Sequence, residues 1–269
     1  MKKTFAFSSL FAAAAGILGA LLRQWHLSAG VDDRGLFPAA HPGWIGYVVL
    51  SLAAVAALWL VTRQAEAATG WKRNFPHDLS DRSSPRFYWN FAKAAFRAAG
   101  YALAAAGIAS YTNSALPGTD ILHTVAYWGG FACAVALLIL SVQLIMGKTP
   151  TAILFLIPCV YFAVLLFKTS HQFRGEPELM RFLPQAAALA FSALSTYQLW
   201  GFAVGWGDRR KSLFWSLSAG MLCLAALPGA QPMYGALGLW HLLAHCALTL
   251  PPEEITEECP ESAEESSEE

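Results

Sequence analysis

The sequence predicts an all-α, polytopic transmembrane helical bundle with about eight spans, on the basis of two observations. Eight apolar stretches occupy most of the 269 residues, and each is long enough to cross a hydrocarbon core about 30 Å thick as a helix. Lys and Arg gather in alternate connections between these stretches, which is typical of short cytoplasmic loops. Residues 1–250 therefore form the predicted bundle, and residues 251–269 form a separate tail.

The individual spans follow from the length of each apolar stretch. The third is weak because it is rich in alanine and begins among Lys93 and Arg97, and the last is short and carries two histidines. An arrangement with seven spans is therefore the alternative. The eight predicted spans are 4–22, 44–62, 95–112, 124–146, 151–167, 183–206, 212–228 and 234–250.

The basic residues also predict the orientation of the chain. Thirteen of the 18 Lys and Arg lie at the N-terminus and in the alternate connections of one side, and five lie on the other side. An even number of spans with this bias places both termini in the cytoplasm. The N-terminus could also be read as a signal peptide, but residues 4–22 are longer than a usual signal core, so a retained helix is predicted.

The last 19 residues differ from the rest, since they contain nine Glu and no Lys or Arg. Pro251 and Pro252 end the last helix, and the segment after them has too little apolar surface to fold. A disordered, acidic cytoplasmic tail is therefore predicted. Its simplest role is solubilising; the alternative is that it folds back on the basic connection 63–97 or competes there for anionic lipid.

The small residues of two spans predict faces at which helices associate closely. Ala12, Gly16 and Ala20 recur every four residues in the first span, and Gly100 and Ala104 do so in the third, with Gly107 a turn further on. Small side chains at this spacing let helix backbones approach in lipid. Such patterns predict packing and carry no information about a ligand.

The most unusual polar feature is the pair His241 and His245 in the last span. Their spacing of four residues puts both imidazoles on one face of a helix, at membrane depth. An ionisable group there is expected to face the bundle interior or a water-filled cavity. A neutral histidine bonded to another helix is the favoured interpretation; a proton relay, substrate binding or metal binding are the alternatives.

A second polar cluster interrupts the sixth span. Hydrogen bonds between helices explain it most simply, and a polar cavity lining is the alternative. If this face meets the histidine face, Tyr197, Gln198, His241 and His245 are the candidate binding residues. The cluster consists of Ser192, Ser195, Thr196, Tyr197 and Gln198.

Basic residues at the cytoplasmic end of the third span predict contact with the lipid interface. Arg86, Lys93 and Arg97 stand at helical spacing beside three aromatic residues. Long basic side chains can extend toward phosphates while aromatic rings lie at head-group level. The predicted partner is the lipid bilayer, including anionic lipid at this face, and nucleic acid is excluded by the adjacent span.

No motif of a known catalytic or cofactor site occurs in the chain. It has no Walker loop, dinucleotide fingerprint, nucleophile elbow or zinc-like arrangement of Cys and His. A protein without enzymatic activity, cofactor or metal is therefore predicted.

Several segments resemble a family of bacterial multi-pass membrane proteins that has no assigned activity. The resemblance implies a bacterial inner-membrane protein and supports the predicted topology, and it implies no chemistry. It covers about half of the chain and rests on Leu22-Arg23, residues 33–36, 157–174, 197–202, 205–211 and 222–227.

Two classes of function follow. The first is a membrane protein that acts by interaction, as a sensor, scaffold or envelope component. The second is a small-solute transporter or channel-like bundle with a polar site between the sixth and eighth spans. The second class predicts a water-accessible cavity at His241 and Tyr197, whereas a close-packed interior favours the first.

Overall fold

The computed structural model describes most of the chain. At several helix ends it describes the backbone alone, and Arg86, Lys93 and His245 are among the residues whose side chains lie outside the description. The predicted acidic tail lies outside it entirely. The described residues are 2–30, 40–63, 85–114, 120–148, 150–172, 179–204 and 207–249.

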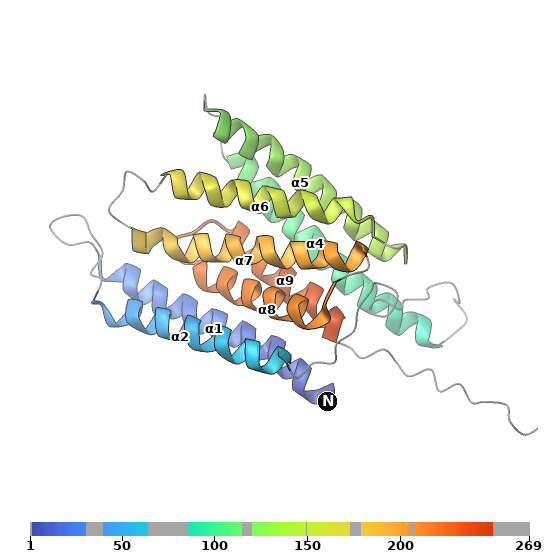
Figure 1. The fold of residues 1–269 in the computed structure, drawn as a ribbon, viewed down its shortest axis with the longest axis horizontal. Helices are drawn as coiled ribbons and strands as arrows, with labels where there is room; N and C mark the ends of the chain where they lie inside the picture. Colours follow the sequence, from blue (N-terminus) through green and yellow to red (C-terminus); the bar gives the residue numbers. More distant parts are fainter. Residues whose placement is uncertain are drawn as a thin grey trace, which may run out of the picture.

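The described residues form eight α-helices, which confirms the predicted fold class. Consecutive helices run in opposite directions, so the start of the first helix and the end of the last lie at the same end of the bundle (Figure 1). Each helix coincides with one predicted span. The helices are α1 (Lys2–Ser28), α2 (Pro42–Arg63), α4 (Pro85–Ser114), α5 (Ile121–Ile145), α6 (Ile153–Gln172), α7 (Leu179–Val204), α8 (Arg209–Ala226) and α9 (Met233–Thr249).

Five of the helices have the length and composition of membrane-spanning helices: α1, α2, α5, α6 and α7. The other three are less apolar or shorter. Helix α8 begins with Arg209, Arg210 and Lys211, α9 has only 17 residues, and α4 carries the polar start that made its span weak in the sequence.

Helices α8, which is less apolar, and α9, which is short, lie at the centre of the bundle. Helix α8 packs against α1, α2, α7 and α9, while α9 packs against α4 and α8 and touches α1 and α7. Helices α2 and α5 form the two edges (Figure 1). From Ser212 to Ala226 no residue of α8 is exposed. The central helix is therefore enclosed by its neighbours, and its own composition need not suit lipid.

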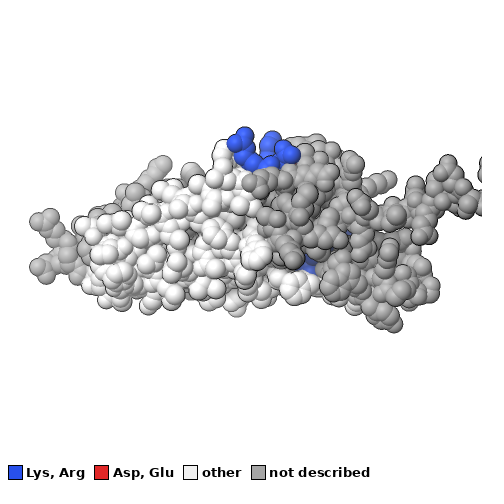
Figure 2. Space-filling view, turned by 90° about the horizontal axis from the view of Figure 1, so that it is seen from below, with Lys and Arg blue, Asp and Glu red and all other residues white. Residues whose placement is uncertain are grey.

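The surface of the bundle is apolar while its interior holds polar side chains. Large apolar residues such as Leu52, Ile121 and Phe7 are each more than 65% exposed. On the face in Figure 2, the described part is almost free of charge, with a small group of basic side chains at one edge. Contiguous apolar surface of this extent is typical of contact with lipid. The described helices thus have the polarity of a membrane protein.

Glycine permits close helix contacts, among them those of α1 with α8 and of α8 with α9. A methyl group on Gly16 would lie 2.9 Å from the carbonyl oxygen of Met221, and one on Gly220 would lie 3.2 Å from the carbonyl oxygen of Gly238. Ala12 and Ala104 are both fully buried. The association faces predicted from small residues in the first and third spans are therefore confirmed.

The end of the first helix differs from the prediction. The sequence places Arg23 and His26 in an outer connection, but both belong to α1 and are at most 2% exposed. Arg23 Nε donates a hydrogen bond of 2.8 Å to the carbonyl oxygen of Pro228, between α8 and α9. This contact lies 205 residues away along the chain, so the local sequence could not reveal it.

The glycine contacts predict that Gly220→Ala destabilises the protein while Gly129→Ala does not. The new methyl group at Gly220 would meet Cγ of Leu242 at 2.9 Å, whereas at Gly129 it would make an ordinary contact of 3.4 Å with Tyr161. Overpacking costs about 1–3 kcal/mol. Unfolding in mixed detergent micelles measures both variants, and equal stabilities would contradict the described contact of α8 with α9.

Candidate functional site: a buried imidazole and hydroxyl network

Three helices bring polar side chains together in the middle of the bundle. Ser192 and Ser195 are three residues apart on α7, which puts both hydroxyls on the face toward α8 and α9. Ser216 and Cys223 are seven residues apart on α8, and His241 comes from α9. All five side chains are at most 1% exposed. They form what we call the imidazole and hydroxyl network.

His241 contacts hydroxyl groups with both of its ring nitrogens. Nδ1 lies 3.2 Å from Oγ of Ser195, and Nε2 lies 3.0 Å from Oγ of Ser192. A neutral imidazole has one donor and one acceptor nitrogen, and a hydroxyl can serve either one. Ser192 and Ser195 therefore match neutral His241 in either tautomer, and no charge has to be buried.

The network continues from both serines to α8. Oγ of Ser195 lies 2.7 Å from Oγ of Ser216, and Oγ of Ser192 lies 3.4 Å from Sγ of Cys223. The hydrogen bonds thus connect Ser216, Ser195, His241, Ser192 and Cys223 in that order. This series of hydrogen bonds begins and ends on α8, at two residues that lie about 10 Å apart along the helix axis. Helices α7, α8 and α9 are joined by these side chains.

Thr196, the third predicted hydroxyl of this face, bonds within its own helix. Its Oγ1 donates toward the carbonyl oxygens of Ser192 and Ala193, both at 2.9 Å. The hydroxyl is satisfied locally, as is common for Ser and Thr in membrane helices. Thr196 therefore adds no hydrogen bond to α8 or α9.

An aromatic layer covers the network on the side of α4 and α6. The ring of Trp240 lies 4.5 Å from that of His241, 5.4 Å from that of Tyr101 and 6.4 Å from that of Phe162, between centroids. Trp240 and Phe162 are fully buried, and Tyr101 is 4% exposed. The rings pack at the tilted and edge-on angles that aromatic groups prefer. Aromatic packing and hydroxyls thus surround His241.

Of the four predicted binding residues, the described structure places only His241 in the network. Tyr197 is 38% exposed on the other side of α7, where its ring packs 5.6 Å from that of Trp200, and Gln198 is half-buried. His241 instead meets Ser192 and Ser195. The side chain of His245 lies outside the described residues. The binding role of Tyr197, Gln198, His241 and His245 stays a prediction.

Arg97 differs from the predicted lipid-interface position. It is 4% exposed, on the face of α4 that also buries Ala94, Ala98 and Tyr101 and packs into the bundle. A side chain extended toward lipid phosphates would instead lie on the outer face. The side chains of Arg86 and Lys93 are outside the description, so their predicted contact with anionic lipid stays a prediction.

Sequence reasoning missed the partners from α8, Ser216 and Cys223. From the sequence, Cys223 is interpreted as a small packing residue. Ser216 is one of several serines in its span, and nothing in the sequence distinguishes it from the others. The available signal is the spacing of Ser212 and Ser216, which places two hydroxyls on one face of an otherwise apolar span. That pattern predicts an interior face without identifying the helix it meets.

Among the described residues, no group of three His, Cys, Asp or Glu is arranged to hold a metal ion. No protein-family model, curated protein or solved structure matches this chain. The functional argument therefore rests on the sequence and on the geometry of the described residues.

The network predicts that Ser195→Ala destabilises the bundle more than Ser170→Ala. The first change removes the bonds to His241 and Ser216, whereas Ser170 is exposed and bonds only to Phe167 of its own helix. Interhelical hydrogen bonds contribute about 0.6 kcal/mol on average and up to about 1.7 kcal/mol. The free energy of unfolding in mixed micelles measures the difference. Equal effects would mean that the network does not hold the helices together.

Proposed function

We propose that this chain is a multi-pass protein of the bacterial cytoplasmic membrane that acts by interaction, as a sensor, scaffold or envelope component, and not by catalysis. The observation that supports this most strongly is the closed environment of His241. Its two ring nitrogens are both engaged by serine hydroxyls, and all five members of the network are buried. The imidazole and hydroxyl network therefore serves helix association.

A transporter with a site between the sixth and eighth spans is the alternative function. It requires water or solute to reach His241 and the polar face of α7. The hydrogen-bond partners of His241 are side chains of the bundle itself, and all five members of the network are buried. This arrangement favours the non-transporting function.

The distribution of basic residues supports a cytoplasmic position for both termini. Arg63 ends α2, Lys148 follows α5, and Arg210 and Lys211 begin α8, all at the end of the bundle where α1 begins and α9 ends (Figure 1). Short cytoplasmic connections carry such an excess of positive charge. The end with Arg63, Lys148, Arg210 and Lys211 is therefore the proposed cytoplasmic face.

The same end has features of an interface with lipid head groups. The guanidinium carbon of Arg63 lies 4.4 Å from the centre of the Trp59 ring, and Trp59 is 46% exposed. Tryptophan and arginine at the end of a span anchor it at the boundary of membrane and water. Anionic lipid at this basic face is the proposed partner, together with a protein partner of unknown identity.

The closed interior predicts that Cys223 does not react with N-ethylmaleimide in the folded protein. The thiolate is the reactive form, and no water is expected at this fully buried thiol. The experiment uses a chain in which Cys223 is the only cysteine, reconstituted in vesicles. The control carries Ser114→Cys instead, at an exposed position at the end of α4.

Alkylation of Cys223 only after denaturation supports the proposal. Reaction of native Cys223 at a rate comparable with that of the Ser114→Cys control would show a hydrated interior, and it would favour the transporter.

The proposed orientation predicts that Cys259, in the C-terminal tail, is protected in intact cells. A chain with Cys259 as its only cysteine should react with an impermeant maleimide only after the membrane is opened. A second chain, with Glu176→Cys between α6 and α7, should react in intact spheroplasts. The reverse labelling pattern would show that the chain has the opposite orientation.

A further inference from the structure

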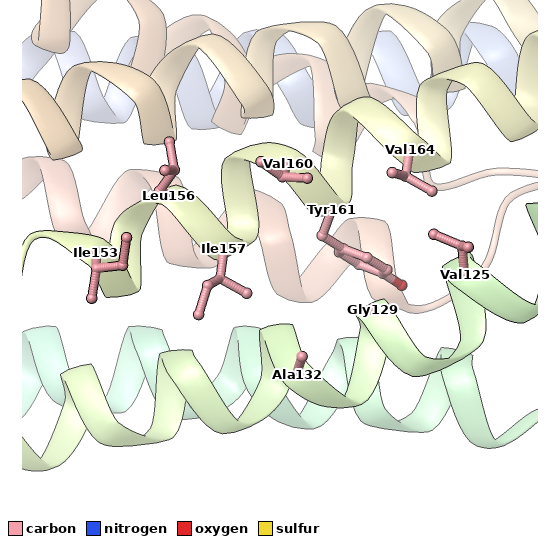
Figure 3. A pocket seen from close by; sticks show the side chains of 9 residues that line it. All are labelled: Val125, Gly129, Ala132, Ile153, Leu156, Ile157, Val160, Tyr161 and Val164. Atoms are coloured by element: carbon pink, nitrogen blue, oxygen red, sulfur yellow. The ribbon is translucent and has the colours of Figure 1, made fainter.

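An apolar groove runs between α5 and α6 on the surface of the bundle (Figure 3). Its volume is about 270 Å³. Gly129 and Ala132 of α5 leave space opposite the larger side chains of α6, and the hydroxyl of Tyr161 is the only polar side-chain group in the lining. The groove is lined by Val125, Gly129 and Ala132 of α5 and by Ile153, Leu156, Ile157, Val160, Tyr161 and Val164 of α6.

A second, larger cavity of about 840 Å³ continues the groove toward the start of α5. The two share Val125, Val160 and Val164, so they form one continuous surface feature, which we call the α5–α6 groove. The wide part ends at Asp120 and His171. The groove is thus apolar along its length and polar at its wide end.

The α5–α6 groove widens toward the start of α5 because the two helices are held together at their opposite end. Gln143 and Thr151 exchange two hydrogen bonds, with Nε2 of Gln143 donating to Oγ1 of Thr151 at 2.9 Å and the amide of Thr151 donating to Oε1 of Gln143 at 3.0 Å. Figure 1 shows α5 and α6 separating from this closed turn toward the start of α5. The groove is therefore built into the helix pair.

The groove faces the side that lipid would cover. Val160 and Phe167 are each more than 50% exposed, and α5 and α6 both have the composition of membrane-spanning helices. If the α5–α6 groove were empty, the side chains that line it would lose dispersion contacts. The narrow part is lined mainly by aliphatic side chains of both helices, so a flexible hydrocarbon chain can follow it and fill the space between them.

The polar end of the groove determines the head group that fits. Oδ2 of Asp120 lies 3.6 Å from Nδ1 of His123, and His171 lines the cavity from α6. Lys168, the nearest described Lys or Arg along α6, is 7% exposed and faces the bundle. A carboxylate and an imidazole at the same end of the groove match a head group that contains both an ammonium and a phosphate, since Asp120 attracts the first and an N–H of His171 can donate to the second.

We propose that the α5–α6 groove binds one amine-bearing zwitterionic phospholipid, such as phosphatidylethanolamine, with an acyl chain between the helices and the ammonium at Asp120. This inference rests on the bilayer position proposed above. It does not depend on the orientation or on the role of His241.

The test uses phosphatidylethanolamine with a photoreactive diazirine on its acyl chain, in vesicles with the full-length protein. Labelled residues are located by mass spectrometry. Ala132→Trp fills the groove from an exposed lining position, and Val135→Trp adds the same side chain to an exposed position of α5 outside the groove. Labelling at Val160 and Val164 should fall about fivefold in the first variant and stay within about twofold in the second.

The head group is tested by competition with unlabelled lipids. Phosphatidylethanolamine should displace the probe from Val160 and Val164 more effectively than anionic phosphatidylglycerol. Asp120→Asn should abolish that preference while it preserves the N-cap of α5, because Asn and Asp cap helices equally well.

Three outcomes would overturn the proposal. Equal labelling of the groove and of the exposed face of α2 would show ordinary surrounding lipid, and equal competition by the two lipids would remove the head-group assignment. If labelling is low in the unsubstituted protein and rises when Ala132→Trp converts a dimer to a monomer, a second copy occupies the groove. Absence of labelling on α2, α5 and α6 alike would instead contradict the bilayer position itself.

Discussion

The structure depends on one constraint, which is that the polar side chains of the helices lie inside the bundle because its surface is apolar. In hydrocarbon an unsatisfied polar group costs several kcal/mol. Helix α8 carries Ser212, Ser216 and Ser218, and all three are buried. Its position among α1, α2, α7 and α9 keeps these hydroxyls away from the outer surface. The apolar helices thus allow a less apolar helix to exist at membrane depth.

The network around His241 follows from the same constraint. A histidine in the last span needs a partner for each ring nitrogen, and Ser192 and Ser195 supply them from one face of α7. Close approach of the backbones makes this possible, since Gly220 and Gly238 meet where α8 and α9 cross. Hydrogen bonds of this kind add modest stability, but they discriminate strongly against rotated helices, because a rotation would leave the imidazole unsatisfied.

The fold was largely predictable from sequence, whereas the partners of the polar residues were not. Length and hydropathy locate the eight helices, strongly for the five that are long and apolar enough to cross a membrane and weakly for the third and the last, which left seven spans as the alternative. The partner of His241 depends on which helix lies beside α9 and on its rotation, and neither is encoded locally. The sequence named Ser192 and Ser195 only as members of a polar cluster of five residues, and it chose from that cluster Tyr197, which faces outward, as a binding residue. Arg23 shows the same limit, since its partner Pro228 is adjacent in space but lies 205 residues away along the chain.

In a bilayer, the outer helices of this bundle should be surrounded by lipid, while α8 should stay enclosed. A photoreactive apolar carbene reagent dissolved in the bilayer tests this directly, because it labels whatever side chains lipid touches and needs no substitution. The exposed residues of α2 and α5, such as Leu52 and Val135, should be labelled, and the segment from Ser212 to Ala226 should not. Labelling of that segment at the level of α2, or no labelling of α2 and α5, would contradict the account.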